Sequence, residues 1–219
     1  PVEIHQREGI ALLNGTSAMT GIGVVNLIYA KKLINWSVLI STCINELVEA
    51  FDDHFSTELN SVKLHHGQLK VAIAMSEMVA DSKLIRKRTD HLYQGSKIEV
   101  DIVEEKVQEY YSLRCVPQIL GPIYDTIRAA ENVVMHEVNS VNDNPIIDSE
   151  NQNIYHGGNF HGDYVALEMD KLKISITKLA MLAERQLNFL LNDKLNQKLP
   201  PFVNLGKLGL NYGSQGMQF

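Results

Sequence analysis

The chain has 219 residues, of which 45% are hydrophobic and 21% charged, a balance typical of a folded domain with a substantial core. Its formal net charge of −6 argues against a nucleic-acid partner or an anionic membrane surface, since both favour basic proteins. No run approaches about 18 unbroken apolar residues, no signal-peptide pattern is present and the two cysteines suggest no disulfide framework, so we expect a cytoplasmic protein without a membrane span.

Helical periodicity dominates the first half of the chain. Residues 24–51 carry apolar residues at helical spacing and predict a long helix, with Thr20 as a candidate N-cap. Residues 52–98 are more polar and predict one or two shorter helices joined by loops. Residues 99–111 also have a helical pattern.

The second half of the chain predicts two further long helices. One covers residues 122–140 and ends before the turn Asp143-Asn144-Pro145, because the residue before a proline avoids helical geometry. A short extended stretch, residues 151–160, follows. The longest helical pattern covers residues 163–196 and is apolar on several sides, as expected in the middle of a bundle or in an oligomer core. Because no strand alternation stands out, we predict an all-α fold, a bundle of long helices.

The first candidate for chemistry is the run VQEYYSLRC. Gln108, Tyr111 and Arg114 are spaced by three residues, which places them on one face of a helix. The guanidinium of Arg114 could bind a carboxylate through two parallel hydrogen bonds, and the Tyr111 hydroxyl could hydrogen-bond a reacting group. An Arg114 that forms a structural ion pair on the surface explains the same spacing, and spacing alone favours that simpler interpretation.

Two asparagines lie in turn signals. Asn14 precedes a glycine, and Thr16 or Ser17 after it can cap the following helix. Asn144 lies in the turn before a proline. Either side-chain amide could donate to and accept from a ligand, but taken alone both runs are better interpreted as turns.

The run HGGNFHG, residues 156–162, raises the question of a metal or phosphate site. His156 and His161 are five residues apart, and no cysteine or carboxylate cluster joins them at metal-ligand spacing, so we expect no metal. The glycine spacing matches neither of the common phosphate-binding loops. On its own the run is best interpreted as a glycine turn.

Six runs in a fixed order are more specific than any one of them. They are REGIALLNGTSAMTG (7–21), YYSLRCVPQILGP (110–122), VNDNPII (141–147), YHGGNFHG (155–162), LAERQLNFLLN (182–192) and LPPFVNLGKLGLNYGSQGMQF (199–219). Together they resemble the middle of the aromatic amino acid ammonia-lyases, over essentially all 219 residues. That family includes histidine, phenylalanine and tyrosine ammonia-lyases and the related 2,3-aminomutases.

The resemblance implies the elimination of ammonia from an L-amino acid to give a trans-α,β-unsaturated acid. The family uses an electrophilic methylidene-imidazolone group, formed from an internal Ala-Ser-Gly. Asn14 matches the asparagine beside that group, Tyr111 the tyrosine next to it, and Phe160 the phenylalanine that packs on the reacting centre. We expect Gly157 and Gly158 to let the backbone bend so that Phe160 faces that centre.

The resemblance also implies how the substrate is bound. Arg114 matches the arginine that binds the substrate carboxylate, Asn144 an asparagine near that carboxylate, and Gln108 a glutamine of the same wall. The family implies a homotetramer. The final run looks slightly more like the tyrosine and aminomutase branch, but the residues present leave open both the substrate side chain and the choice between lyase and aminomutase.

No Ala-Ser-Gly occurs in the 219 residues, and we expect it to precede Pro1, with further active-site residues beyond Phe219. Residues 1–219 would then be the central helical part of a larger subunit, inactive when isolated. One alternative is the fumarase and argininosuccinate lyase superfamily, whose Gly-Ser-Ser loop followed by Met-Pro-x-Lys is absent. The other is a non-catalytic helical oligomerisation module.

Overall fold

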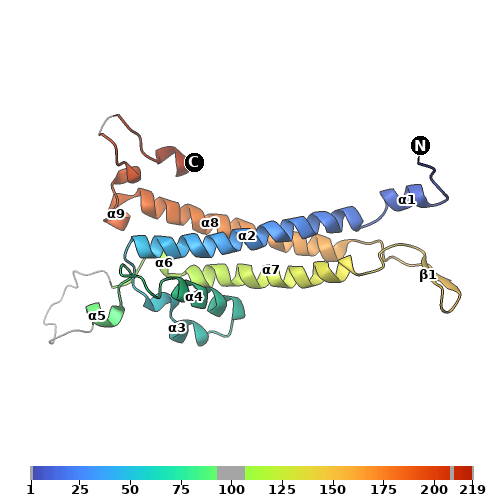
Figure 1. The fold of residues 1–219 in the computed structure, drawn as a ribbon, viewed down its shortest axis with the longest axis horizontal. Coiled ribbons are helices and arrows are strands. Elements are labelled where there is room, and N and C mark those ends of the chain that lie inside the picture. The colour runs from blue at the N-terminus through green and yellow to red at the C-terminus, as the bar shows by residue number, and fades with distance from the viewer. Residues whose placement is uncertain (1, 93–106, 208–209, 219) are drawn as a thin grey trace. The chain divides into compact units, whose positions relative to one another are not determined.

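The computed structural model describes residues 2–92, 107–207 and 210–218 and consists mainly of helices (Figure 1). The chain divides into two compact units. Unit 1 comprises Pro1–Lys32 and Thr126–Ile174, and unit 2 comprises Leu33–Asp125 and Ser175–Phe219. The long helices α2, α7 and α8 each contribute residues to both units.

The described elements confirm the all-α prediction, with one small hairpin added. The α-helices are α1 (Glu8–Leu13), α2 (Ser17–Leu47), α3 (Thr57–Ser61), α4 (His66–Met78), α5 (Arg88–Leu92), α6 (Tyr111–Arg114), α7 (Val116–Val138), α8 (Asp163–Leu191) and α9 (Asp193–Asn196). The 3-10 helices are η1 (Asp53–Phe55), η2 (Pro201–Val203) and η3 (Gln215–Gln218). Strands β1 (Ile146–Asp148) and β2 (Asn153–Tyr155) pair antiparallel, with Ile147 opposite Ile154.

Two predicted long helices begin earlier than the sequence pattern suggested. Helix α2 begins at Ser17, so Thr20 is not its N-cap; its hydroxyl donates to the Thr16 carbonyl inside the helix. Gly23 lies inside the helix and allows close packing, since an added Cβ would lie 3.2 Å from Val165 Cγ1. Helix α7 begins at Val116 and continues through Pro122, which the sequence pattern had placed at a helix boundary.

The helix predicted over residues 99–111 is wrong in its described part. Residues 107–110 are not helical, and α6 begins only at Tyr111, after Tyr110 with φ −57° and ψ 151°. Residues 99–106 lie outside the described residues. The last predicted helix, 163–196, is interrupted at Asn192, whose side chain accepts a hydrogen bond from the Lys194 amide and starts α9.

The core of unit 2 explains why α2 folds as a helix. The buried residues Ile34, Val38, Ser41 and Asn45 step by four, three and four, which places them on one helical face. At the end of α2 a buried cluster forms from residues of distant segments. Its members are Ile44, Val48, Ala50, Leu113 and Phe189.

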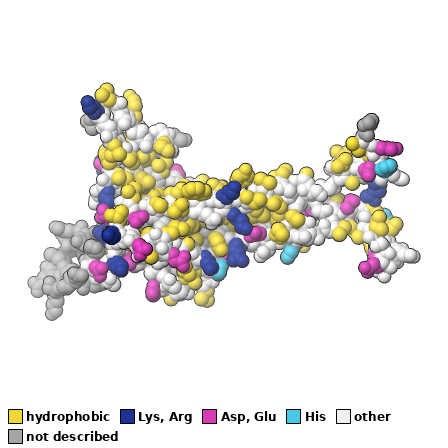
Figure 2. Space-filling model, viewed as in Figure 1, with side chains coloured by type: hydrophobic (Ala, Val, Ile, Leu, Met, Phe, Trp, Pro, Cys, Tyr) yellow, Lys and Arg dark blue, Asp and Glu magenta, His cyan; other side chains and the backbone are white. Residues whose placement is uncertain are grey.

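Another face of α2 is exposed and apolar. Exposed side chains include Val25, Ile28, Trp36 and Leu39, and Figure 2 shows hydrophobic side chains over the long helices. The stretch Glu8–Leu47 meets the length and composition criteria for a membrane span, which core helices of soluble proteins also meet. The expectation that the chain has no membrane span stays a prediction.

A buried polar network in unit 2 surrounds His54. Its Nε2 lies 2.9 Å from Asn45 Oδ1, and Asn60 donates to the His54 carbonyl at 3.2 Å. Gln68 Nε2 in turn donates to Asn60 Oδ1 at 2.9 Å. Burial lowers the pKa of His54 to about 4, outweighing the acidic side chains of Asp53 and Glu109 nearby.

We predict that His54 makes stability depend on pH between about 6.5 and 4. In this window the unfolded state binds a proton at His54 and the folded state does not, so stability is fully present above about pH 6.5 and falls as the pH drops. The loss reaches about 3 kcal/mol in wild type. In His54→Gln, urea unfolding measured across this window should show a flatter pH dependence, and an unchanged slope would contradict the assignment.

Candidate functional site

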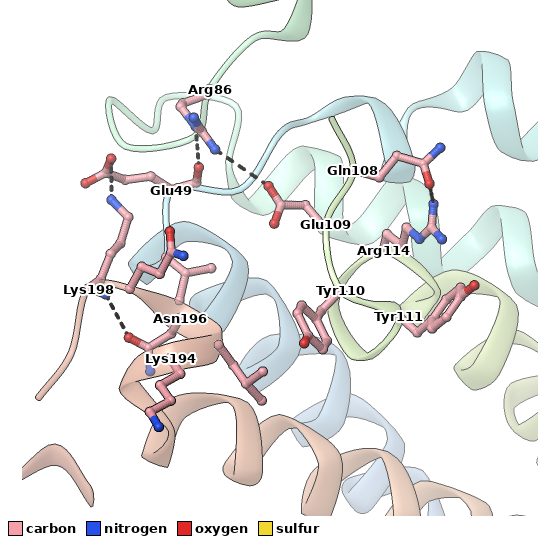
Figure 3. Close-up of a pocket in the computed structure, with 13 residues that line it drawn as sticks. Glu49, Arg86, Gln108, Glu109, Tyr110, Tyr111, Arg114, Lys194, Asn196 and Lys198 are labelled. Carbon is pink, nitrogen blue, oxygen red and sulfur yellow. Dashed lines mark hydrogen bonds and ion pairs between the residues drawn. The ribbon is translucent and has the colours of Figure 1, made fainter. Parts of the chain in front are cut away.

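Unit 2 contains an open pocket of about 950 Å³ beside α6 (Figure 3). Gln108, Tyr111 and Arg114, the three residues singled out in VQEYYSLRC, all line it. The remaining lining residues come from the two positions after α2, from Arg86, from the segment just before α6, and from α9 with the residues after it. The predicted grouping is therefore present, although Gln108 reaches it from the segment before α6 and not from a shared helical face.

Arg114 is arranged as a donor with unused capacity. One terminal nitrogen, Nη1, donates to Gln108 Oε1, and Figure 3 shows the two side chains pointing toward each other. Its Cζ lies 4.6 Å from the centre of the Tyr111 ring. Its Nε is buried and has no hydrogen-bond partner among the described residues. The side chain as a whole is only partly buried and lines the pocket, so its terminal N–H groups make this guanidinium a candidate for binding an acceptor from outside the chain.

The pocket lining has a positive excess. It carries four cationic and two anionic side chains, a net charge of +2, from Arg86, Arg114, Lys194, Lys198, Glu49 and Glu109. A pocket with this balance attracts an anionic ligand. Arg86, Glu49 and Lys198 were not predicted, because they are dispersed along the chain and match no motif.

Two of the four cationic side chains of the pocket, Arg86 and Lys198, are paired with its anionic side chains. Arg86 Nε donates to the Glu49 carbonyl at 2.7 Å, and its Nη2 lies 3.7 Å from Glu109 Oε1 (Figure 3). Lys198 Nζ lies 2.5 Å from Glu49 Oε2 and holds the pKa of that carboxyl below its usual value. The acceptor seen on Arg114, by contrast, is a neutral amide.

Hydrogen bonds in unit 1 join the Asn14 and Asn144 segments. Arg7 Nη2 donates to the Asn144 carbonyl at 2.6 Å, so the residue at the start of α1 holds the turn before Pro145. Asn142 Nδ2 donates to Thr16 Oγ1 at 2.5 Å, and that hydroxyl donates to Glu137 Oε1 at 3.1 Å. Asn14 is exposed and is the C-cap of α1, two positions before Thr16 in the sequence.

The same turn is also hydrogen-bonded to the HGGNFHG run. The Gly157 amide donates to Asn144 Oδ1 at 2.7 Å, and Asn159 Nδ2 donates to the Val141 carbonyl at 3.3 Å. The Asn144 side-chain oxygen already accepts this hydrogen bond. The Nδ2 group is the donor that the side chain can offer to a ligand. Three motifs that are distant in the sequence thus meet in unit 1.

The expected role of Gly157 and Gly158 is not found. An added Cβ would meet nothing within 4 Å at either position, and neither has a left-handed φ, so this bend is open to any L-residue. Gly162 is the crowded position, where a Cβ would lie 2.1 Å from the flexible end of Met19. Phe160 follows the bend with 46% of its surface exposed.

The two histidines of the run are not joined into a metal-binding cluster within the described ranges. His161 Nδ1 lies 3.3 Å from Asp163 Oδ2 at the start of α8, a contact that fits a helix-start residue.

The predicted site residues are divided between the units. Gln108, Tyr111 and Arg114 belong to unit 2 and lie together at its pocket. Asn14, Asn144 and Phe160 belong to unit 1. There the turn at Asn144 is hydrogen-bonded to the segment around Asn14 and to the HGGNFHG run. The bonding groups are chiefly those of Arg7, Asn142 and Gly157.

Comparison with known proteins gives one consistent result. A tyrosine 2,3-aminomutase from Myxococcus sp. (strain Mx-B0) is 40% identical over 224 residues, which cover 100% of this chain and 43% of that protein. A tyrosine ammonia-lyase from Cereibacter sphaeroides is 36% identical over 219 residues, 100% of this chain and 42% of that protein. An MIO-dependent tyrosine 2,3-aminomutase from Streptomyces globisporus is 35% identical over 225 residues, with 100% and 42% covered.

A solved structure agrees with these relatives. The phenylalanine aminomutase of Pantoea agglomerans matches with a TM-score of 0.92 and 34% identity, covering 100% of this chain and 43% of that chain. The chain thus spans about two fifths of the length of the relatives it matches. The model of the family described as aromatic amino acid lyase matches residues 1–219. This chain belongs to the aromatic amino acid lyase family.

Proposed function

We propose that the protein containing this chain is a carbon-nitrogen lyase that eliminates ammonia from an aromatic L-amino acid, tyrosine or histidine, to give a trans-α,β-unsaturated acid. Relatives with ammonia-lyase and aminomutase names support this reaction class. The observation that carries the proposal is that, among the described residues, Arg114 lies at a pocket with a positive excess and has the neutral Gln108 amide as its acceptor.

Arg114 acts in this proposal by binding the substrate carboxylate. A planar guanidinium can form two parallel hydrogen bonds to a carboxylate, which fixes the position and the orientation of the substrate. Gln108 accepts from Nη1 and restricts the guanidinium before the substrate arrives. Orientation of the reacting groups lowers the barrier by reducing the entropy lost in the transition state. Asn144, in unit 1, also has an Nδ2 group that can donate to a carboxylate.

Each unit presents a donor of the kind that suits a methylidene-imidazolone group, and that group would supply an electrophile for the substrate when bound. Tyr111 is 71% exposed and presents a hydroxyl donor, and Asn14 is exposed and presents an amide donor. Such donors stabilise negative charge that develops on an oxygen. Phe160 presents an exposed aromatic face that can exclude water from a reacting centre. We infer that residues outside these 219 supply the Ala-Ser-Gly.

A 2,3-aminomutase is the second candidate, favoured by the 40% identity to a tyrosine 2,3-aminomutase. It shares the residues described above, so product analysis distinguishes the two. The unsaturated acid together with free ammonia supports the lyase, whereas a β-amino acid supports the aminomutase.

We further propose a cytoplasmic homotetramer. The exposed apolar residues of α2, among them Trp36 and Leu39, support burial against other copies or other parts of the subunit. The same surface supports the other candidate, a helical oligomerisation module without catalytic activity.

Replacing Arg114 tests the proposed function. In the full-length enzyme, Arg114→Met should lower kcat/KM for L-tyrosine or L-histidine by about 10²–10³, because an ionic clasp is worth several kcal/mol. Arg114→Lys keeps the charge and should recover only part of the loss. Arg128→Met, an exposed arginine of α7, is the control and should retain full activity. Wild-type-like kinetics of Arg114→Met would sink the proposal.

Phe160 should matter for turnover more than for stability. Phe160→Ala in the full-length enzyme should lower kcat strongly with little change in the unfolding midpoint, since the side chain is half exposed. The matched control is Phe189→Ala, where loss of a core side chain should cost about 3–5 kcal/mol of stability. Equal losses of activity and stability in Phe160→Ala would make this run a structural turn.

The 219-residue piece expressed alone should be inactive, because it contains no Ala-Ser-Gly from which the electrophile forms. The measurement is the ultraviolet absorbance of the unsaturated acid after incubation with each L-amino acid. Product formation above a heat-treated control would refute this prediction.

A further inference from the structure

Helix α6 carries Tyr111 and Arg114 but has only four residues. All of its carbonyls belong to a helix end, so they need partners from outside the helix. The Tyr111 carbonyl accepts from the Cys115 amide. The Ser112 carbonyl instead accepts from the side chain of Gln186, at 3.0 Å.

Gln186 lies on α8 and is 3% exposed. Its Nε2 donates both to the Ser112 carbonyl and, at 2.8 Å, to Ser41 Oγ on α2. Ser41 is also buried, and its hydroxyl lies 3.3 Å from Gln186 Oε1. One amide therefore connects α2, α6 and α8 within unit 2, and both of its N–H groups are used.

We propose that Gln186 is a positioning residue that fixes the orientation of α6 and thereby aims the Arg114 guanidinium at the substrate carboxylate. The inference rests on the proposed function of Arg114. Gln186 acts through Ser112, which lies two residues before Arg114, and does not itself line the charged pocket. The run LAERQLNFLLN, which contains Gln186, has no other role in the proposed reaction.

Packing alone does not account for this residue. A buried amide costs free energy unless its hydrogen bonds are made, so an apolar side chain of the same length would fill the same volume without that cost. The specific contribution of the amide is to hold the Ser112 carbonyl at a defined place. Without it, α6 keeps the burial of Leu113 but loses the hydrogen bond between its backbone and α8.

The test compares ligand binding to full-length variants. The probes are trans-4-hydroxycinnamate, which has a carboxylate, and its primary amide, which has the same ring without the charge. Gln186→Met should weaken binding of the acid about tenfold, equivalent to about 1.4 kcal/mol, and leave binding of the amide within about twofold. Ser41→Ala should produce a smaller loss in the same direction, because it frees the Gln186 amide to rotate.

Gln68→Met is the matched control, since Gln68 is also 3% exposed in unit 2 but donates to Asn60 and not to α6. It should bind both probes as wild type does, whatever its unfolding midpoint. Equal weakening of acid and amide in Gln186→Met, or acid-specific weakening in Gln68→Met, would overturn the inference. If the wild type itself does not bind the acid more tightly than the amide, the proposed function of Arg114 fails. If the wild type prefers the acid and Gln186→Met binds both probes as the wild type does, only the inference about Gln186 fails.

Discussion

Burial of Leu113 is the interaction on which the charged pocket depends. Isolated helices shorter than about 12–15 residues are marginal in water, so the four residues of α6 take their conformation from what surrounds them. Leu113 is fully buried in the cluster with Phe189 at the end of α2. Tyr111 and Arg114, one on each side of it in sequence, line the pocket. The hydrophobic effect that forms this core therefore also sets where the candidate substrate-binding side chains lie.

Unit 1 holds its motifs by a different kind of force. Its turn at Asn144 contains no fully buried apolar residue comparable to Leu113; within the described residues, it is fixed by hydrogen bonds from Arg7 and Gly157. These bonds are directional but partly exposed, and each contributes only about 0.5–1.5 kcal/mol. Several of them together define the turn, at a place where the sequence carries strong turn signals.

Periodicity predicted the long helices because each buries a wide apolar face, but it failed where tertiary contacts decide the structure. Pro122 lies inside α7 although its local preference favours a boundary. Gln108 lies at the pocket although its segment is not helical. Arg7 donates a hydrogen bond to a residue 137 positions away, and Arg86 forms an ion pair with a residue 23 positions away. No local sequence pattern encodes such contacts. The order of six motifs identified the family, whereas the residues that support those motifs emerged only from the fold.

The charges of the pocket explain why one arginine is suited to bind a ligand. Arg86 approaches the buried carboxylate of Glu109, and Lys198 pairs with Glu49, so each of these cations is matched to an anion of the scaffold. Arg114 is held by the neutral amide of Gln108, which orients the guanidinium without neutralising it. Among the described residues no anion pairs with Arg114, so an incoming carboxylate is attracted by a charge that these residues leave unmatched, more strongly where burial limits screening by water. Within the part of the chain that the structure describes, the pairing of Arg86 and Lys198 with anions and the neutral partner of Arg114 are thus two parts of one electrostatic arrangement.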